Sequence, residues 1–430
     1  MKIIQACGDS IQETVRSFLK RGNDDFRDID EKVGQIIGQV RIKGDSALYS
    51  YTEIFDKVAL TGIRVEKKEI EEAVNKTDPE FLEILKEAAE NIRNYHKNQK
   101  EETWMLENGD KTVLGQIIMP LSRVGIYIPG GKAAYPSTVL MNAIPAKVAG
   151  VARIAMVTPP DSEGGVNSDI LAAAHVAGID EIYKVGGAQA IAALAYGTET
   201  IHPVDKITGP GNIYVARAKQ AVFGTVDIDM MAGPSEIFII ADENQNPEFI
   251  AADLLSQAEH DELAGVILAT PSKELAEQVA QAVARQSRLL EKREIAETSV
   301  RDNGFIFVTD NIEQTFEIAN EVAPEHLEIM LENPDGYVPL VRNAGAIFLG
   351  SYSPEPVGDY FAGPNHTLPT SGTARFSSAL GVYDFIKRTS YIKYSKESLG
   401  KNKSKIMKFA NREGLTAHAN SIKVRFDCDD

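Results

Sequence analysis

Several protein classes are excluded by what this chain of 430 residues lacks. Cysteine occurs only twice, as Cys7 and Cys428, which excludes a disulfide framework and a cysteine-rich structural zinc site. No stretch approaches the roughly 18 consecutive apolar residues that a membrane-spanning helix needs. The first residues also lack the long apolar segment of a secretory signal. We therefore expect a soluble protein of the reducing cytoplasm, without a membrane partner.

Positive charge is scarce as well. The chain has 45 Lys and Arg against 62 Asp and Glu, a net charge of −17. Such an acidic surface repels a phosphate backbone, so we expect no nucleic-acid partner. Hydrophobic residues make up 43% and charged residues 25%, the balance of a globular protein. The length predicts roughly two to three domains, each with its own core.

Short apolar runs alternate with helical patterns from about residue 113 onward. The runs include VGIYIP, RIAMVTPP, EIYKVGG, EIFIIAD, AGVILAT, GFIFVTD and GAIFLG. Strands of this length separated by helices are typical of βαβ units around a parallel sheet. The preceding part is mostly helical, and its clearest helix follows Asp78-Pro79, with Asp78 as the N-cap. Further helices are expected over 311–322 and 403–412.

The fold class that we predict is α/β, with two incomplete Rossmann-like domains and smaller N- and C-terminal helical or extended segments. The expected divisions are an N-terminal helical segment (1–25), a first α/β domain with the metal and catalytic residues (26–118 with 236–380), a second, dinucleotide-binding α/β domain (119–235), and a C-terminal tail domain (381–430).

Glycine-rich turns stand at three expected strand-to-helix junctions. They are Pro129-Gly130-Gly131, Gly186-Gly187 and Gly209-Pro210-Gly211. Free backbone N–H groups and the helix dipole favour a phosphate at such junctions. None fits G-x-G-x-x-G with an acidic residue about 20 positions later, so the usual dinucleotide fingerprint is absent. Each turn alone is equally explained by backbone geometry, whereas the three together favour a nucleotide or another anion.

Gln257 and His260 lie three residues apart at the end of an expected helix, so their side chains emerge on one face. Such a histidine often caps terminal carbonyl groups, and glutamine is an uncommon metal ligand. Further candidates come later: Asp359 in a Gly- and Pro-rich loop, where an Asx turn is the alternative, and His418 just past a helix. Together these four make a mixed nitrogen and oxygen set that suits Zn²⁺ or Mn²⁺.

Glu325 and His326 follow Pro324, and this order predicts the first turn of a helix. There the dipole would support a carboxylate and lower the basicity of an imidazole. A neighbouring Glu and His can divide the roles of base and acid. The simpler interpretation is a favourable charge at a helix N-terminus.

The motifs taken together resemble those of the histidinol dehydrogenase family, over nearly the whole chain. The segments that carry the resemblance are VGIYIPGG, GPGNIYVARAKQ, MMAGPSEI, LLSQAEHD, APEHLEI, GAIFLGSYSPEPVGDYFAGPNHTLPT and GLTAHANSI. The resemblance implies a zinc enzyme that oxidises L-histidinol through the aldehyde to L-histidine, the last steps of histidine biosynthesis. Two NAD molecules would be reduced in succession.

The resemblance also implies roles for individual residues. The zinc ligands, one ion per subunit, would be Gln257, His260, Asp359 and His418. Glu325 and His326 match the catalytic pair. Ser235 and Glu413 match substrate contacts, together with His326 and the four ligands. Tyr127, Gln189 and Asn212 match the dinucleotide-binding positions. The family implies a homodimer with shared active sites, in which Glu413 and His418 of the tail act in the partner's site.

Two other functions remain open from the residues alone. One is a metal-dependent hydrolase that uses Glu325 as general base on a metal-bound water. The other is a non-enzymatic anion-binding α/β protein whose late histidines are structural. Mn²⁺ or Co²⁺ would fit the same ligands as Zn²⁺, and the missing acidic selector leaves NAD and NADP undistinguished.

Overall fold

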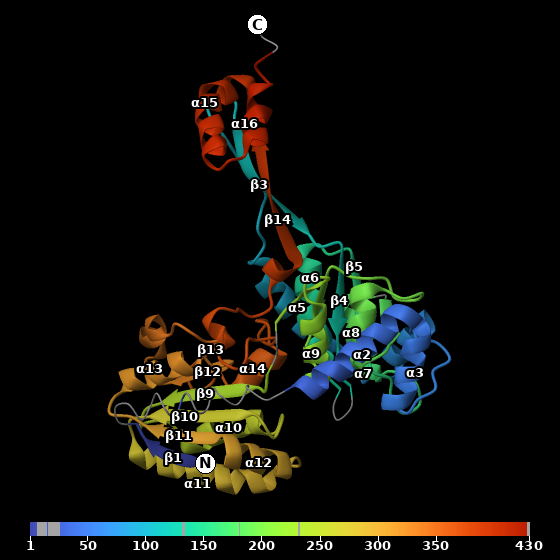
Figure 1. The fold of residues 1–430 in the computed structure, drawn as a ribbon. Coiled ribbons are helices and arrows are strands. Elements are labelled where there is room, and N and C mark those ends of the chain that lie inside the picture. The colour runs from blue at the N-terminus through green and yellow to red at the C-terminus, as the bar shows by residue number, and fades with distance from the viewer. Residues whose placement is uncertain (7–14, 16–25, 131–133, 180, 231–232, 428–430) are drawn as a thin grey trace. The chain divides into compact units, whose positions relative to one another are not determined.

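The computed structural model describes residues 1–6, 15, 26–130, 134–179, 181–230 and 233–427 (Figure 1). It divides into two compact units. Unit 1 comprises Met1–Gln99 and Leu121–Phe385, and unit 2 comprises Lys100–Pro120 and Ile386–Asp430. Most of the expected N-terminal helical segment lies outside the described residues. Within it, Lys2–Gln5 forms strand β1.

Unit 1 contains a parallel five-stranded sheet with the order β6-β5-β4-β7-β8. Its strands are β4 (Arg123–Tyr127), β5 (Arg153–Thr158), β6 (Glu181–Lys184), β7 (Lys206–Thr208) and β8 (Asp227–Ile228). The connecting helices are α6 (Pro136–Ala149), α7 (Ser168–Ala177), α8 (Gly187–Tyr196) and α9 (Ile213–Val222). Strand order reverses between β4 and β7, and open α/β sheets bind ligands beyond the carboxyl ends at such a point.

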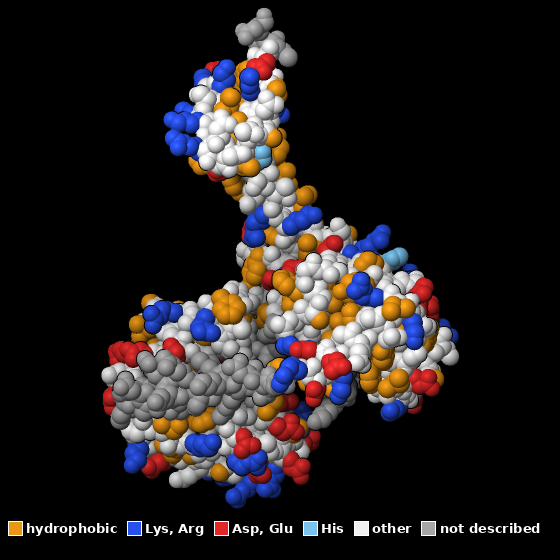
Figure 2. Space-filling view, viewed as in Figure 1, with side chains coloured by type: hydrophobic (Ala, Val, Ile, Leu, Met, Phe, Trp, Pro, Cys, Tyr) orange, Lys and Arg blue, Asp and Glu red, His pale blue; other side chains and the backbone are white. Residues whose placement is uncertain are grey.

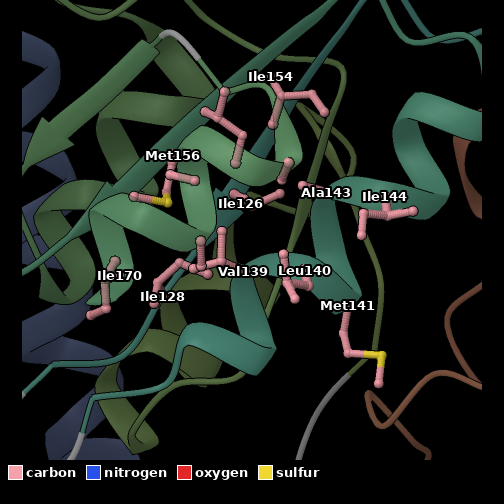
Figure 3. Packing of buried hydrophobic residues seen from close by; sticks show 14 of the residues in the cluster. Ile126, Ile128, Val139, Leu140, Met141, Ala143, Ile144, Ile154, Met156 and Ile170 are labelled. Carbon is pink, nitrogen blue, oxygen red and sulfur yellow. The ribbon is translucent and has the colours of Figure 1, made fainter. Parts of the chain in front are cut away.

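The core of this sheet is formed by alternating strand residues and one face of the helices. In Figure 3, Ile126 and Met156 of the sheet lie close to Val139 and Leu140 of α6. All four side chains are almost fully buried. Burial of this extent is the main stabilising contribution to the domain.

Four earlier helices pack on the same sheet, namely α2 (Arg27–Lys43), α3 (Asp45–Phe55), α4 (Lys67–Lys76) and α5 (Pro79–Lys97). Helix α5 begins as expected, because the Asp78 side chain accepts a hydrogen bond from the backbone N–H of Glu80. The sequence had grouped 26–118 with 236–380. The observed packing instead joins 27–97 to the sheet of 119–235, because that sheet covers the apolar faces of these helices.

The second sheet of unit 1 is also parallel, with the order β1-β11-β10-β9-β12-β13. Its other strands are β9 (Glu236–Ala241), β10 (Gly265–Thr270), β11 (Gly304–Val308), β12 (His326–Met330) and β13 (Ala346–Leu349). Its helices are α10 (Pro247–Ala258), α11 (Lys273–Gln286), α12 (Arg293–Asn303), α13 (Ile312–Val322) and α14 (Glu355–Tyr360). The strand order from β11 to β13 repeats that of the other sheet, so the predicted pair of incomplete Rossmann-like domains is confirmed.

Helices α10, α11 and α12 share one buried cluster with this sheet, and α13 shares another. Four short 3₁₀ turns complete the described part of unit 1: Ser287–Leu289, Pro334–Leu340, Thr373–Arg375 and Val382–Phe385.

Unit 2 is an antiparallel sheet with the order β14-β3-β2, followed by two helices. Its elements are β2 (Trp104–Glu107), β3 (Val113–Pro120), β14 (Ile386–Lys393), α15 (Lys396–Arg412) and α16 (Thr416–Lys423). The helix expected over 403–412 is the second half of α15. Lysine and arginine side chains gather on the exposed surface of α15 (Figure 2). Across the described ranges, no helix is long and apolar enough to span a membrane.

Candidate active site

Glu325 and His326 lie at the amino end of β12, beside the amino end of its parallel neighbour β9. Glu236 is the first residue of β9, and His326, the first of β12, is paired with Ile237. The Glu325 carboxylate accepts a hydrogen bond from the backbone N–H of Glu236 at 2.9 Å. His326 Nδ1 lies 3.1 Å from the carbonyl oxygen of Glu236. The backbone of Glu236 thus contacts both side chains of the pair.

The expected helix start at Pro324 is wrong. Helix α13 ends at Val322, Ala323 adopts the left-handed conformation with φ 50°, and the chain then enters β12. The local reason is that proline suits the first residue of a strand as well as that of a helix. Glu325 and His326 therefore do not lie in the first turn of a helix.

Helix α10 brings Gln257 and His260 together. Gln257 Nε2 lies 3.5 Å from His260 Nδ1, and His260 follows the last residues of the helix. Gln257 is fully buried, and its Oε1 has no hydrogen-bond partner among the residues described. A buried amide oxygen without a donor costs roughly 1–3 kcal/mol. A cation at this oxygen would remove that cost.

Helix α14 contributes two carboxylates from one face. Glu355 and Asp359 are four residues apart, a spacing that brings two helical side chains together. Asp359 thus lies on a short helix rather than in a loop, and its Oδ1 is 3.7 Å from His326 Nε2. His326, Glu355 and Asp359 each offer one ligand atom, and these atoms lie within 4.8 Å of one another. This group has the composition of a metal site.

The buried charges shift the acidities of the group strongly. Burial raises the pKa of Glu325 to about 7. Burial also raises the pKa of Glu236, to about 8, with a further contribution from the charge of Glu325. Burial alone would lower the pKa of His326, but the charge of Glu325, the Asp359 carboxylate 3.7 Å from Nε2 and the charge of Glu355 outweigh it and raise the pKa to about 10. The pocket is therefore one that favours bound cations.

A second layer of polar residues supports this group and was not anticipated from the sequence. The backbone N–H of Glu355 donates to Glu328 Oε1 at 2.8 Å, and Ser256 Oγ donates to Glu355 Oε2 at 2.8 Å. His366 Nδ1 lies 3.0 Å from the carbonyl oxygen of Asp359. The signal for Glu328 was a carboxylate inside an apolar strand run, and for Glu355 the four-residue spacing to Asp359.

Tyr127, Gln189 and Asn212 lie at the carboxyl edge of the five-stranded sheet. Tyr127 ends β4, and its hydroxyl accepts a hydrogen bond from the backbone N–H of Gly187 at 3.0 Å. Gln189, in the first turn of α8, is buried, and its Oε1 finds no hydrogen-bond partner in the described part of the chain. Asn212 caps α9 by accepting hydrogen bonds from the N–H groups of Tyr214 and Val215. Tyr127 ends β4, Gln189 follows β6 and Asn212 follows β7, so all three residues lie at the carboxyl edge of the sheet.

The remaining predicted residues lie in two places. Ser235 directly precedes β9 and is partly buried, at the same edge as Glu325. Glu413 follows α15 and His418 lies on α16, both exposed and both in unit 2. In the described residues of unit 2, no group of His, Cys, Asp or Glu side chains is arranged to hold a metal ion.

Comparisons with known proteins match nearly the whole chain. The family model for histidinol dehydrogenase matches residues 19–426. The chain is 57% identical over 410 residues to the histidinol dehydrogenase of Halalkalibacterium halodurans, covering 95% of this chain and 97% of that one. It is 54% identical over 417 residues to that of Bacillus subtilis, covering 97% and 98%. The crystal structure of histidinol dehydrogenase from Elizabethkingia anophelis superposes with a TM-score of 0.94 at 40% identity, covering 100% of this chain and 98% of that one.

Proposed function

The chain belongs to the histidinol dehydrogenase family and is an oxidoreductase, and on this premise we propose that it oxidises L-histidinol through L-histidinal to L-histidine. The reaction completes histidine biosynthesis, uses zinc and NAD, and takes place in the cytoplasm. The observation that carries the proposal is the Glu325–His326 pair held against Glu236 beside the polar ends of α10 and α14.

Zinc fits the residues that surround this pair. Gln257, His260 and Asp359 would hold the ion in unit 1, and His418 of a second subunit would complete the set. The buried Oε1 of Gln257, which has no hydrogen-bond partner among the residues described, supports this assignment, because its amide group lies beside His260. Asp359 also belongs to the group with His326 and Glu355. When bound, zinc supplies a template that holds the amino and imidazole nitrogens of the substrate.

His326 is the proposed base for the alcohol proton. A carbonyl oxygen can only accept, so the proton between His326 and Glu236 stays on Nδ1. Nε2 is then the atom that gains and loses a proton. It is buried and has no hydrogen-bond partner among the described residues, which leaves it available to a substrate hydroxyl. A cation held beside Asp359 would offset the carboxylates that raise the pKa of His326, so that the ring would be neutral and able to accept the proton. NAD, when bound, accepts the hydride in each oxidation.

Glu325 is the proposed base for the second oxidation. Its carboxylate would remove a proton from the water that attacks the aldehyde carbon, and His326 would take the proton of the resulting hydrate. A pKa raised to about 7 by burial suits this task, because a general base works best when its pKa lies near the working pH. Retaining the aldehyde in the buried site limits its release.

NAD fits the carboxyl edge of the five-stranded sheet. Tyr127, Gln189 and Asn212 would contact it there. The buried Oε1 of Gln189, for which the described part of the chain offers no hydrogen-bond partner, supports this assignment. Ser235 and Glu413 would contact the substrate, together with His326 and the metal-binding side chains.

A homodimer with shared sites is part of the proposal, with Glu413 and His418 acting on the partner's site. Unit 2 exposes large apolar side chains that a partner would cover: Trp104 at 53%, Leu106 at 57%, Ile392 at 71% and Phe409 at 70%. Exposed apolar groups gathered in one small unit are typical of an interaction surface.

The proposal is tested by following NADH during incubation with L-histidinol. We expect about two NADH per histidinol, because oxidation of an alcohol to an acid releases two hydrides. Chelation should abolish the activity, and addition of Zn²⁺, Mn²⁺ or Co²⁺ should show which ion restores it. Release of a hydrolysis product without NADH would favour the metal-dependent hydrolase instead.

A variant pair tests the metal assignment independently of activity. Gln257→Ala should lower the zinc that the protein retains after dialysis against chelator, by about tenfold or more. Gln278→Ala removes an exposed glutamine of α11 and should retain zinc as the unmodified protein does. Equal retention by both variants would contradict a role for Gln257 as a ligand.

A further inference from the structure

We propose that Lys219 and Asp229 act as positioning residues for the dinucleotide, by holding the loop Gly209–Asn212 in its binding conformation. The inference takes the identity of the ligand from the proposed function. Lys219 lies inside α9 and Asp229 directly follows β8, and their side chains are only 4% and 1% exposed. Their hydrogen bonds and ion pair within the described residues of unit 1 join them to each other, to Gly209 and to Met230, not to the catalytic group, so the ion pair calls for another explanation.

The ion pair holds both peptide groups of Gly209. Lys219 Nζ donates to the carbonyl oxygen of Gly209 at 3.0 Å and forms an ion pair with Asp229 Oδ1. Asp229 Oδ2 accepts the backbone N–H of Gly209 at 2.7 Å. The N–H of Met230 donates to Asp229 Oδ1 at 2.7 Å. The loop at the end of β7 is therefore tied to the end of β8 through one buried carboxylate.

Gly209 also lies directly against β4. Its φ is +109°, and a Cβ at this position would lie 2.2 Å from the carbonyl oxygen of Tyr127. The Tyr127 hydroxyl in turn accepts the N–H of Gly187, the first residue of α8, which follows β6. A shift of Gly209 would thus displace the carboxyl end of β4, beside which the sheet reverses its strand order. Open α/β sheets bind their ligands at such a point.

Stability alone is a weak explanation for this pair. Removing two charges from water offsets most of their attraction, so a buried ion pair often stabilises no more than apolar residues of similar volume. Two charge-assisted hydrogen bonds to the backbone of Gly209, one from the ammonium group and one to the carboxylate, do fix a backbone geometry. Pre-organised donors and acceptors lower the cost of ordering a loop on binding. Asn212 is the last residue of this loop, and the first turn of α9 follows it directly.

The same sheet offers a matched control. Lys206 is also buried, and its Nζ pairs with Asp227 at 3.0 Å and with Asp384 at 3.5 Å. It is the first residue of β7, however, at the amino end of the strand, whereas Gly209 follows the carboxyl end. Lys206→Met therefore removes a buried ammonium group from the same strand without touching the loop.

The experiment measures the dissociation constant of NADH for the zinc-loaded, full-length protein, from the fluorescence of bound NADH. Lys219→Met should weaken NADH binding by about tenfold, the value of a hydrogen bond to a charged group. The KM for NAD should rise with it, whereas the KM for histidinol and kcat at saturating NAD should stay near the unmodified values. Lys206→Met should lower the melting temperature, because it removes a buried ion pair, but should leave NADH affinity unchanged.

A double variant separates positioning from folding. Lys219→Met with Asp229→Asn removes both charges, so no charge remains buried without its partner. It should fold even where Lys219→Met alone does not, and its NADH affinity should stay low. Unchanged NADH affinity in the double variant, or an equal loss in Lys206→Met, would overturn the inference.

The two proposals fail in different ways. If Lys219→Met weakens NADH binding but the unmodified protein forms no NADH from histidinol, the proposed function is wrong and the role of the pair is supported. If the protein oxidises histidinol and Lys219→Met does not change the rate at limiting NAD, only the role of the pair is wrong.

Discussion

His326 Nδ1 lies 3.1 Å from the carbonyl oxygen of Glu236, and this contact determines which nitrogen of the ring can act as a base. Asparagine at this position can still donate to the same carbonyl, because its amide nitrogen replaces Nδ1, but it has no counterpart of Nε2. We expect His326→Asn to fold normally and to lose about a hundredfold or more of kcat in both oxidation steps, as loss of a general base does.

The control for this change is His96→Asn. His96 is a fully buried histidine of α5, and its Nδ1 is hydrogen-bonded to Gln99 at 2.7 Å. Its replacement should lower the melting temperature and preserve kcat. If His326→Asn retained the kcat of the unmodified protein with either histidinol or histidinal, His326 would not be the base.

Glu325→Gln separates the two half-reactions. The glutamine oxygen can still accept the N–H of Glu236, so the geometry around β9 should be kept. Oxidation of histidinal should fall by about a hundredfold or more, because no base remains to activate water. Oxidation of histidinol should fall much less. Each step is measured separately with NAD, and Glu321→Gln on the exposed side of α13 serves as control. Equal loss in both steps would contradict the assignment.

Much of the fold could be predicted because its signals are local. The alternating apolar runs predicted the parallel strands, and the Asp78-Pro79 start of α5 was correct down to the cap. What the sequence did not reveal was the sheet on which the early helices pack. Their apolar faces show that they are buried, but not against which partner, because that choice depends on contacts between residues far apart in the chain.

In the candidate site too, local patterns were predictable and contacts between distant segments were not. Gln257 and His260 were predicted to share a helical face, and their side chains do lie together. The contact between His326 and Asp359 joins β12 to α14, and no local pattern encodes that distance. The error at Pro324 arose because proline begins strands and helices alike. The alternation of His326 and Glu328 with the apolar Leu327 and Ile329 was the better signal there.

Shared active sites predict complementation between two inactive variants. His418→Ala and Glu325→Gln, mixed after gentle dissociation and allowed to reassemble, should give hybrid dimers in which one site contains both functional residues. About a quarter of the unmodified activity is expected at equal mixing, because half of the dimers are hybrids and each has one intact site. Mixtures of each variant with itself are the controls. Absence of recovery, with hybrid dimers shown to be present, would rule out a role for His418 in trans.

The partly buried carboxyl group of Asp56 should make the free energy of unfolding depend on pH. Asp56 directly follows α3, its Oδ2 is buried without a hydrogen-bond partner among the described residues, and burial raises its pKa from 3.8 to about 6. Between these two values the folded protein keeps a proton that the unfolded chain has released, so this carboxyl makes the free energy of unfolding fall as the pH rises. Below the lower value both states are protonated, and above the higher value the loss is complete.

Asp56→Asn removes this dependence. The free energy of unfolding of Asp56→Asn, minus that of the unmodified protein, should therefore increase by about 1 kcal/mol between about pH 3.8 and pH 7. This value is smaller than the full pKa difference implies, because the side chain is partly solvated. Urea unfolding of both proteins at the two pH values, with chelator and without NAD, measures the change. All other titrating groups are common to the pair, so they cancel in the comparison. A difference between the two proteins that stays constant with pH would show that Asp56 keeps its ordinary acidity in the fold.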